Sequence, residues 1–371
     1  MKFNEQVTRI EPSPLRAFND MAHKEGAELF LTLGEPDFHT PQQVKDACGV
    51  ALENNKTFYA PTMGVAELRR EISAFEKQLN GVDYDENEIM ITTGSTEAIM
   101  SALFAVVNEG DEVIVPVPAF SMYKPVIELC KGRYVELNTA PDNFQITEKA
   151  LASVVSDKTK AIILTSPNNP TGTLISHQLL RALLARCREA GALLVVDQCF
   201  LELSPGEPDR LVRELEGGGL LLLRALTKSY AMAGLRLGYC LSDDRTLLAA
   251  MAEEGPPWPV SQLAQQAGIS ALQNAPDWPF RVHQQLEEER RYLSQELSRL
   301  RFHVYPSDSN FLLFQGEEGW RERLLDRGIL IRSCADFQGL GPGFYRVCVR
   351  SRGENQRLIQ AIQQEREAFH G

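Results

Sequence analysis

One lysine stands alone in the second half of this 371-residue chain. Residues 161–371 contain 22 arginines and a single lysine, Lys228, whereas residues 1–160 contain ten lysines and five arginines. A lysine amine can lose its proton and form a Schiff base with a carbonyl compound, and a guanidinium group cannot. Lys228 is therefore either a nucleophile or an ordinary surface lysine, and the other motifs of the chain must decide between the two.

Four other patterns carry groups that could act together with this lysine. Asp197 ends an apolar strand, where a carboxylate needs a partner; it is either the counter-charge of a buried cation or part of a salt bridge or cap. SPNNPTGT (166–173) predicts a tight turn, structural or aimed into the crevice beyond the strand ends. GST (94–96) opens a helix whose N-terminus either binds a phosphate or is simply capped. Arg236 is a second candidate for binding a phosphate.

The elements that position these groups alternate between strands and helices. Apolar runs predict strands at 111–118, 161–167, 192–200, 219–226 and 236–242. Apolar residues at helical spacing predict helices at 42–55, 64–80, 94–107 and 177–191. This order predicts an α/β domain with a mostly parallel sheet. A long charged helix at 276–300 then leads to a smaller α+β region, with extended segments in 302–314, 328–334 and 344–350 and helices at 320–327 and at the C-terminus.

The composition excludes several classes of protein. Hydrophobic residues make up 43% and charged residues 24% of the chain, as in soluble globular proteins. The net charge of -12 and the lack of a basic run argue against a nucleic-acid partner. We expect no membrane span, because no run of 18 apolar residues occurs, and no signal peptide. Seven scattered cysteines without a CxxC motif indicate reduced thiols in the cytoplasm, and we predict no metal site.

In their order and spacing, the motifs resemble those of the fold-type I enzymes of aminotransferase class I/II, which depend on pyridoxal 5'-phosphate (PLP). The resemblance covers nearly the whole chain and includes LGEPDF (33–38), YAPTMGVAELR (59–69), GSTEAI (94–99), VPVPAF (115–120), SPNNPTG (166–172) and LTKSYAMAGLRLGY (226–239). It implies a large PLP-binding α/β domain of residues 42–270 and a small α+β domain of residues 271–371, which the N-terminal segment 1–41 joins. It also implies a homodimer.

The resemblance assigns a role to each site residue. Lys228 would form the Schiff base with PLP and then move a proton, while Asp197 would pair with the pyridine nitrogen. The remaining contacts would come from residues that hold the phosphate (Ser95, Thr96, Arg236 and, across a dimer interface, Tyr59), from residues that contact the ring (Phe120 and Asn169) and from residues along the substrate path (Gly34, Asn169, Arg332 and Arg346). Among these, Arg346 would bind the α-carboxylate of the substrate.

Two positions depart from the family pattern. Phe200 replaces the tyrosine of a DxxY motif that binds the ring oxygen, and Ala225 replaces a frequent serine or threonine phosphate ligand. We expect altered ring electronics and somewhat weaker phosphate binding.

The two halves of the chain favour different relatives. The run ILIRSCADFQGLGPGFYRVCVRS (329–351) is similar to threonine-phosphate decarboxylase and histidinol-phosphate aminotransferase, whereas IEPSPLRAF (10–18) is similar to general aminotransferases. The N-terminal His-Gly-Gly-Asn motif with which the decarboxylase binds a phosphate is absent from this sequence. We expect an aminotransferase that moves an amino group between an amino acid, phosphorylated or not, and a 2-oxo acid. The alternatives are a decarboxylase of a phosphorylated amino acid such as threonine phosphate, a PLP-binding regulatory domain, and an inactive chain with mismatched halves.

Overall fold

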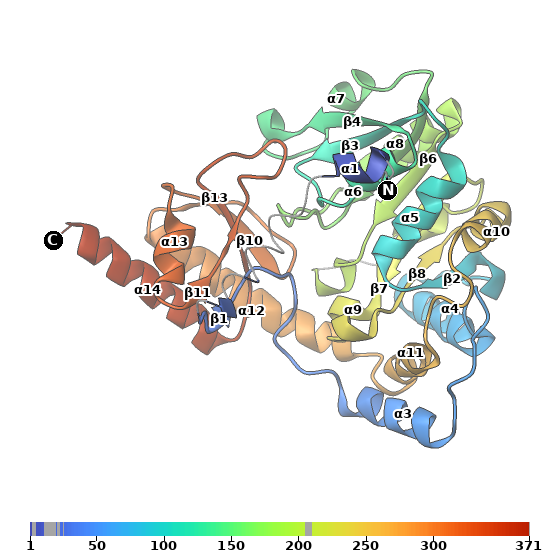
Figure 1. Ribbon diagram of the computed structural model, residues 1–371, viewed down its shortest axis with the longest axis horizontal. Helices are drawn as coiled ribbons and strands as arrows, with labels where there is room; N and C mark the ends of the chain where they lie inside the picture. Colours follow the sequence, from blue (N-terminus) through green and yellow to red (C-terminus); the bar gives the residue numbers. More distant parts are fainter. Residues whose placement is uncertain (2–4, 11–19, 21–22, 25, 205–209, 371) are drawn as a thin grey trace.

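The computed structural model describes residues 1, 5–10, 20, 23–24, 26–204 and 210–370. Of the segment IEPSPLRAF, which resembles general aminotransferases, only Ile10 belongs to these described residues. The rest of this segment lies outside them. The described chain forms two groups of elements, which are joined by the long helix α12 (Trp278–Arg299) (Figure 1).

A seven-stranded sheet forms the centre of the larger group, with the strand order β2-β8-β7-β6-β5-β3-β4. Along the chain these strands are β2 (Ile89–Thr92), β3 (Glu112–Val117), β4 (Arg133–Asn138), β5 (Thr159–Thr165), β6 (Leu193–Asp197), β7 (Leu220–Ala225) and β8 (Gly238–Leu241). Only β8 runs antiparallel to its neighbours β2 and β7; the other pairs are parallel. The carboxyl ends of six strands and the amino end of β8 therefore meet at one edge of the sheet.

Helices cover both faces of this sheet, which explains why its central strands are apolar at successive positions. Leu220 and Leu222 of β7 pack into one hydrophobic cluster, and Leu221 and Leu223 pack into another. The helices of the first face are α4 (Ala66–Asn80), α8 (His177–Ala190) and α11 (Gln262–Asn274). Those of the second face are α5 (Ser95–Val106), α6 (Tyr123–Leu129) and α10 (Arg245–Glu254). The mostly parallel α/β sheet expected from the sequence is confirmed.

The smaller group contains a four-stranded antiparallel sheet with the order β12-β13-β10-β9. Its strands are β9 (His303–Val304), β10 (Phe311–Gln315), β12 (Arg332–Ser333) and β13 (Phe344–Cys348), and the helices α13 (Trp320–Leu325) and α14 (Arg352–His370) lie beside it (Figure 1). Near the N-terminus, β1 (Leu29–Phe30) pairs in parallel with β11 (Ile329–Leu330). Leu29 and Leu31 share a hydrophobic cluster with α12 and β10.

Several elements differ from the sequence expectation. The expected strand at 192–200 ends at Asp197, because the backbone N–H of Cys199 donates to Asp197 Oδ1 and turns the chain. The expected segment 328–334 divides into β11 and β12, which belong to different sheets. Among the elements that were not expected from the sequence are α1 (Glu5–Arg9), α7 (Glu148–Ala152), β2, β4, α6, α10 and α11. The expected helix at 42–55 is α3 (Gln42–Glu53). The domain limits remain predictions.

Two further features concern the whole described chain. All seven cysteines are free thiols. Within the described residues, no helix combines the length and the apolar character needed to cross a bilayer.

Three buried charged residues, Arg224, Glu76 and Glu202, lie together in the large group of elements. Arg224 lies in β7, shortly before α9 (Leu226–Ser229). Arg224 of β7 is fully buried, and its guanidinium nitrogens lie 3.3 Å from Glu202 Oε1 and 3.9 Å from Glu76 Oε2. Glu76 also accepts hydrogen bonds from Tyr239 (2.7 Å) and Asn80 (2.6 Å). Burial raises the pKa of Glu202 from 4.5 to about 7, and the nearby Arg224 opposes this rise.

This group predicts a pH-dependent stability. We expect the wild-type protein to lose stability relative to Glu202→Gln as the pH rises from 4.5 to about 7. A carboxyl with a raised pKa binds its proton more tightly in the folded state, so the free energy of unfolding falls with pH across this window. Urea unfolding of both proteins at pH 5 and pH 8 measures the effect. A free-energy difference that is equal at the two pH values would contradict it.

Candidate active site

The residues chosen from the sequence gather at the edge where the strands of the large sheet end. Lys228 lies in the one-turn helix α9 directly after β7, and Asp197 is the last residue of the neighbouring β6. Asn169 follows β5, the next strand along the sheet. The remaining expected cofactor contacts of this sheet flank other strand ends: Phe120 follows β3, Ser95 and Thr96 follow β2, and Arg236 precedes the antiparallel β8. This convergence follows from the strand directions.

The amine of Lys228 has no polar partner in the described part of the chain. No hydrogen bond or salt bridge to Lys228 Nζ occurs there, and this atom lies 5.9 Å from the centre of the Phe200 ring. Phe200 is itself buried and packs edge-on against Phe311, with the two ring centres 5.2 Å apart. An amine that lies beside an aromatic ring and forms no ion pair is available to react.

Asp197 is a buried carboxylate that receives two hydrogen bonds. The phenol of Tyr123 donates to Oδ2 at 3.0 Å, and the backbone N–H of Cys199 donates to Oδ1 at 3.1 Å. Burial raises the pKa of Asp197, while these hydrogen bonds lower it. No salt bridge joins Asp197 to a basic side chain among the residues that the structure describes. The carboxylate therefore favours an added cation beside it.

The groups that orient this carboxylate were not predicted from the sequence. The Tyr123 hydroxyl lies 2.7 Å from Thr165 Oγ1 as well as near Asp197, so it connects the ends of β5 and β6. Phe120, expected at the cofactor ring, packs edge-on against Tyr123 with the ring centres 5.7 Å apart. The only available signal was the position of Tyr123 three residues after Phe120, within the helix that follows the VPVPAF motif.

Arg236 lies beside the N-terminus of α5. Gly94 precedes the helix with a φ of 93°, and no side chain caps the free N–H groups of the first turn. Arg236 Nη2 donates to the Thr93 carbonyl at 3.1 Å. The positive φ favours glycine at this position, and a Cβ atom on Gly94 would lie 2.9 Å from Arg236 Nη2. Uncapped N–H groups, the helix dipole and an arginine together suit a phosphate.

Arg346 faces this edge from the small sheet. It lies in β13, is buried, and donates to Asn169 Oδ1 and to the Thr32 carbonyl, the latter at 2.6 Å. Its guanidinium lies 5.0 Å from the centre of the Phe311 ring, and burial lowers its pKa. The bond to Asn169 joins the two sheets across 177 residues of sequence. A buried guanidinium held in this way is suited to bind a carboxylate.

Gly34 and Tyr59 occupy different environments. A Cβ atom on Gly34 would lie 3.2 Å from the Phe200 ring and 3.4 Å from Phe311, so glycine keeps space open beside both rings. No contact among the described residues joins Tyr59 to the groups above. Its ring is 79% exposed and stacks on Trp258, which is 48% exposed, with the ring centres 4.3 Å apart.

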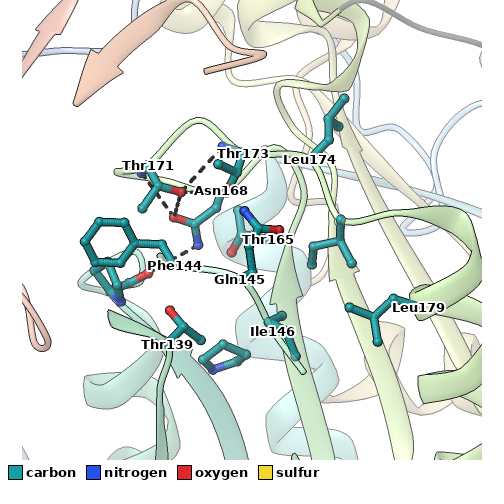
Figure 2. A pocket seen from close by; sticks show the side chains of 13 residues that line it. Thr139, Phe144, Gln145, Ile146, Thr165, Asn168, Thr171, Thr173, Leu174 and Leu179 are labelled. Atoms are coloured by element: carbon teal, nitrogen blue, oxygen red, sulfur yellow. Dashed lines mark hydrogen bonds between the residues drawn. The ribbon is translucent and has the colours of Figure 1, made fainter. Parts of the chain in front are cut away.

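A small cavity of about 20 Å³ lies beside the turn that follows β5 (Figure 2). Its lining includes Thr139, Phe144, Thr165 and Asn168. The Asn168 amide oxygen accepts hydrogen bonds from the backbone and the hydroxyl of Thr171, as Figure 2 shows. A space of this size holds about one water molecule and no substrate. Asn168 therefore builds the turn, while its neighbour Asn169 contacts Arg346.

Comparison with known proteins agrees with this geometry. The family model for aminotransferase class I and II matches residues 28–362. The chain belongs to this family. It is 28% identical over 98% of both chains to a probable aspartate/prephenate aminotransferase of Aquifex aeolicus. It is 34% identical to the threonine-phosphate decarboxylase of Salmonella typhimurium, over 74% of this chain and 76% of the relative.

Solved structures of this family share its fold. The aspartate aminotransferase of Thermotoga maritima superposes with a TM-score of 0.89 at 25% identity, covering 98% of this chain and all of that chain. The Thermus thermophilus aspartate aminotransferase with maleate gives 0.88 at 28% identity over 98% and 99%. The protein is a PLP-dependent aminotransferase of fold type I, as the sequence resemblance implied.

The described residues fit the cofactor. The buried carboxylate of Asp197 has no basic partner among the described residues and suits a protonated ring nitrogen. The uncapped N-terminus of α5 and Arg236 suit the phosphate. The unpaired amine of Lys228 suits the aldehyde carbon.

Proposed function

We propose that the groups at this sheet edge transfer an amino group between an α-amino acid and a 2-oxo acid. The observation that carries the proposal is the convergence of Lys228, Asp197 and Arg346 from three separate strands on one edge. When bound, PLP withdraws electrons from the substrate Cα and so weakens its bond to hydrogen.

Each residue contributes a defined action. Lys228 Nζ would hold the cofactor through its aldehyde carbon. Once the substrate amine has displaced Nζ, this nitrogen would take the proton from the substrate Cα and deliver it to that same cofactor carbon. Asp197, oriented by Tyr123, keeps the ring nitrogen protonated. Arg346 binds the α-carboxylate and Asn169 lies beside it. Phe120 covers a face of the ring, and the backbone and hydroxyls of Ser95 and Thr96, with Arg236, hold the phosphate.

The test is a panel of amino acids with pyruvate or 2-oxoglutarate as acceptor, with the new amino acid and the new 2-oxo acid measured together. Equal amounts of both products support amino transfer. O-phospho-L-threonine is included with a measurement of CO₂. Release of CO₂ without a need for any 2-oxo acid would assign the chain to decarboxylation instead.

Replacing Arg346 by methionine should raise the KM for the amino acid about 100-fold, with a smaller effect on kcat. The substitution removes a buried, charge-assisted contact to the carboxylate, for which about 3 kcal/mol is typical. Arg346→Lys should recover only part of the loss, because an ammonium group lacks the paired geometry. Steady-state kinetics with a varied amino acid measures both constants. A fall in kcat at unchanged KM would contradict this role.

We also propose that the chain works as a cytoplasmic homodimer of two-domain subunits. The pairing of β1 with β11 supports joining residues 1–41 to a small domain of residues 271–371, beside a large domain of residues 42–270. The exposed rings of Phe58, Tyr59 and Trp258 favour a partner subunit over this surface, which Tyr59 would cross to reach the phosphate. Seven free thiols favour a reducing compartment. Light scattering that gives the mass of a single 41.5 kDa chain would exclude the dimer.

A further inference from the structure

Two arginines lie side by side on the small sheet. Arg332 of β12 is the register partner of Arg346 in β13, and directly opposed residues of an antiparallel pair point to the same face. Both are nearly buried, with exposed fractions of 8% and 5%. The charge of Arg332 is one of the causes that lower the pKa of Arg346. Two cations held this close in a poorly hydrated place require anionic partners.

Asp336 forms an ion pair with one of these two arginines, Arg332. Arg332 Nη2 donates to Asp336 Oδ2 at 2.7 Å, and Nη1 donates to the Ser333 carbonyl at 2.5 Å. The Phe337 ring covers the same guanidinium, with its centre 5.0 Å away. The ion pair is 9% exposed on the arginine side chain and 28% exposed on the aspartate side chain. Asp336 therefore neutralises Arg332, whereas Arg346 has no carboxylate partner among the described residues and donates to the neutral oxygens of Asn169 and Thr32.

The segment that carries Asp336 is fixed on both sides. Phe337 is buried in a cluster with Leu313 and Cys334. The next residue, Gln338, accepts a hydrogen bond from Tyr134 at 2.7 Å and donates to Glu136 at 2.5 Å, so it is tied to the region of β4. These contacts hold the backbone of Asp336 beside Arg332.

The charges of this group leave room for one anion. Arg332 and Arg346 contribute two positive charges and Asp336 one negative charge, so a single carboxylate on Arg346 balances them. A second carboxylate or a phosphate that lay near Arg332 would have to displace Asp336 or lie against it, and both arrangements are costly. Building on the proposed function, we propose that Asp336 selects amino acids and 2-oxo acids whose only anionic group is the α-carboxylate. Pyruvate is then a better acceptor than 2-oxoglutarate, because both acids use the same site.

The test compares kcat/KM for L-alanine and L-leucine with kcat/KM for L-aspartate, L-glutamate and O-phospho-L-threonine. We expect the wild type to prefer the first group, and Asp336→Asn to shift the ratio toward the second group by about 10-fold or more. Asp336→Ala should shift it in the same direction. Adding Arg332→Met to Asp336→Asn should cancel the shift, because the released cation is then gone. Asp83→Asn is the matched control: Asp83 is 70% exposed, pairs with Lys77 and should leave the ratio unchanged.

Calorimetric binding of succinate and propionate to the same proteins gives a readout without turnover. Asp336→Asn should tighten succinate binding about 10-fold relative to propionate. If no amino acid is turned over but this gain appears, the proposed function fails and the role of Asp336 stands. If amino transfer occurs but neither ratio changes in Asp336→Asn, or the wild type prefers the dicarboxylic acids, the role of Asp336 is overturned and the proposed function stands.

Discussion

Replacing Lys228 by alanine should lower kcat for amino transfer by at least about 10⁴-fold, because one nitrogen is both the nucleophile and the proton carrier. No other lysine occurs in residues 161–371 that could replace this nucleophile. Within the described residues, the Lys228 amine also has no hydrogen-bond or ion-pair partner. The covalent bond is measured separately. After borohydride reduction, mass spectrometry should find the cofactor mass on the peptide that contains Lys228 in the wild type and on no peptide in the variant.

Two controls separate chemistry from folding in this experiment. Lys228→Arg keeps the positive charge but cannot form the bond, so it should be about as inactive as the alanine variant. Lys149→Ala removes an exposed lysine of α7 and should retain wild-type activity. Substantial turnover by Lys228→Arg would show that the position supplies charge and not a nucleophile.

Replacing Asp197 by asparagine should lower kcat by about 10²–10³-fold, the usual loss when one preorganised electrostatic contact is removed from an active site. Asparagine keeps the size of the side chain and can still accept the Cys199 hydrogen bond, but it cannot hold a proton on the ring nitrogen by charge. The affinity for PLP should fall as well. Steady-state kinetics and equilibrium dialysis of PLP measure the two effects.

Tyr123→Phe is a milder variant that serves as the control for Asp197→Asn. It removes one of the two hydrogen bonds to the carboxylate and keeps the charge, so we expect a loss of about 10-fold in kcat. If Tyr123→Phe were as damaging as Asp197→Asn, the charge of Asp197 would not be the deciding factor. If Asp197→Asn were fully active, its pairing with the ring nitrogen would be wrong.

The residues with the reactive chemistry could be chosen from the sequence because their signals are local. Lys228 and Asp197 lie at the ends of apolar runs, and SPNNPTG and GST lie at strand-to-turn and turn-to-helix junctions. In a mostly parallel sheet, such junctions meet at one edge, so a correct reading of the strands already places the groups near each other. The family resemblance added the role of each residue.

The partners of these residues were not predictable in the same way. Tyr123 contacts both Thr165 and Asp197, which lie 42 and 74 residues further along the chain. Glu76 and Glu202 neutralise Arg224 from two distant segments, and the sequence showed Arg224 only as one residue of an apolar run. The signal for Asp336 lay in a motif that was already quoted, but its pairing with Arg332 depends on the register of β12 and β13.

The sequence by itself indicated which reactive groups meet at this sheet edge, because the type of a side chain and the ends of strands are properties of short segments. The tertiary structure alone decided which charges remain unpaired. The direction of β8 brings Arg236 to Gly94, the contact between the two sheets brings Arg346 to Asn169, and the fixed segment beside β4 keeps Asp336 on Arg332. Pairing of charges is a long-range property, since it depends on packing between segments that no local pattern connects.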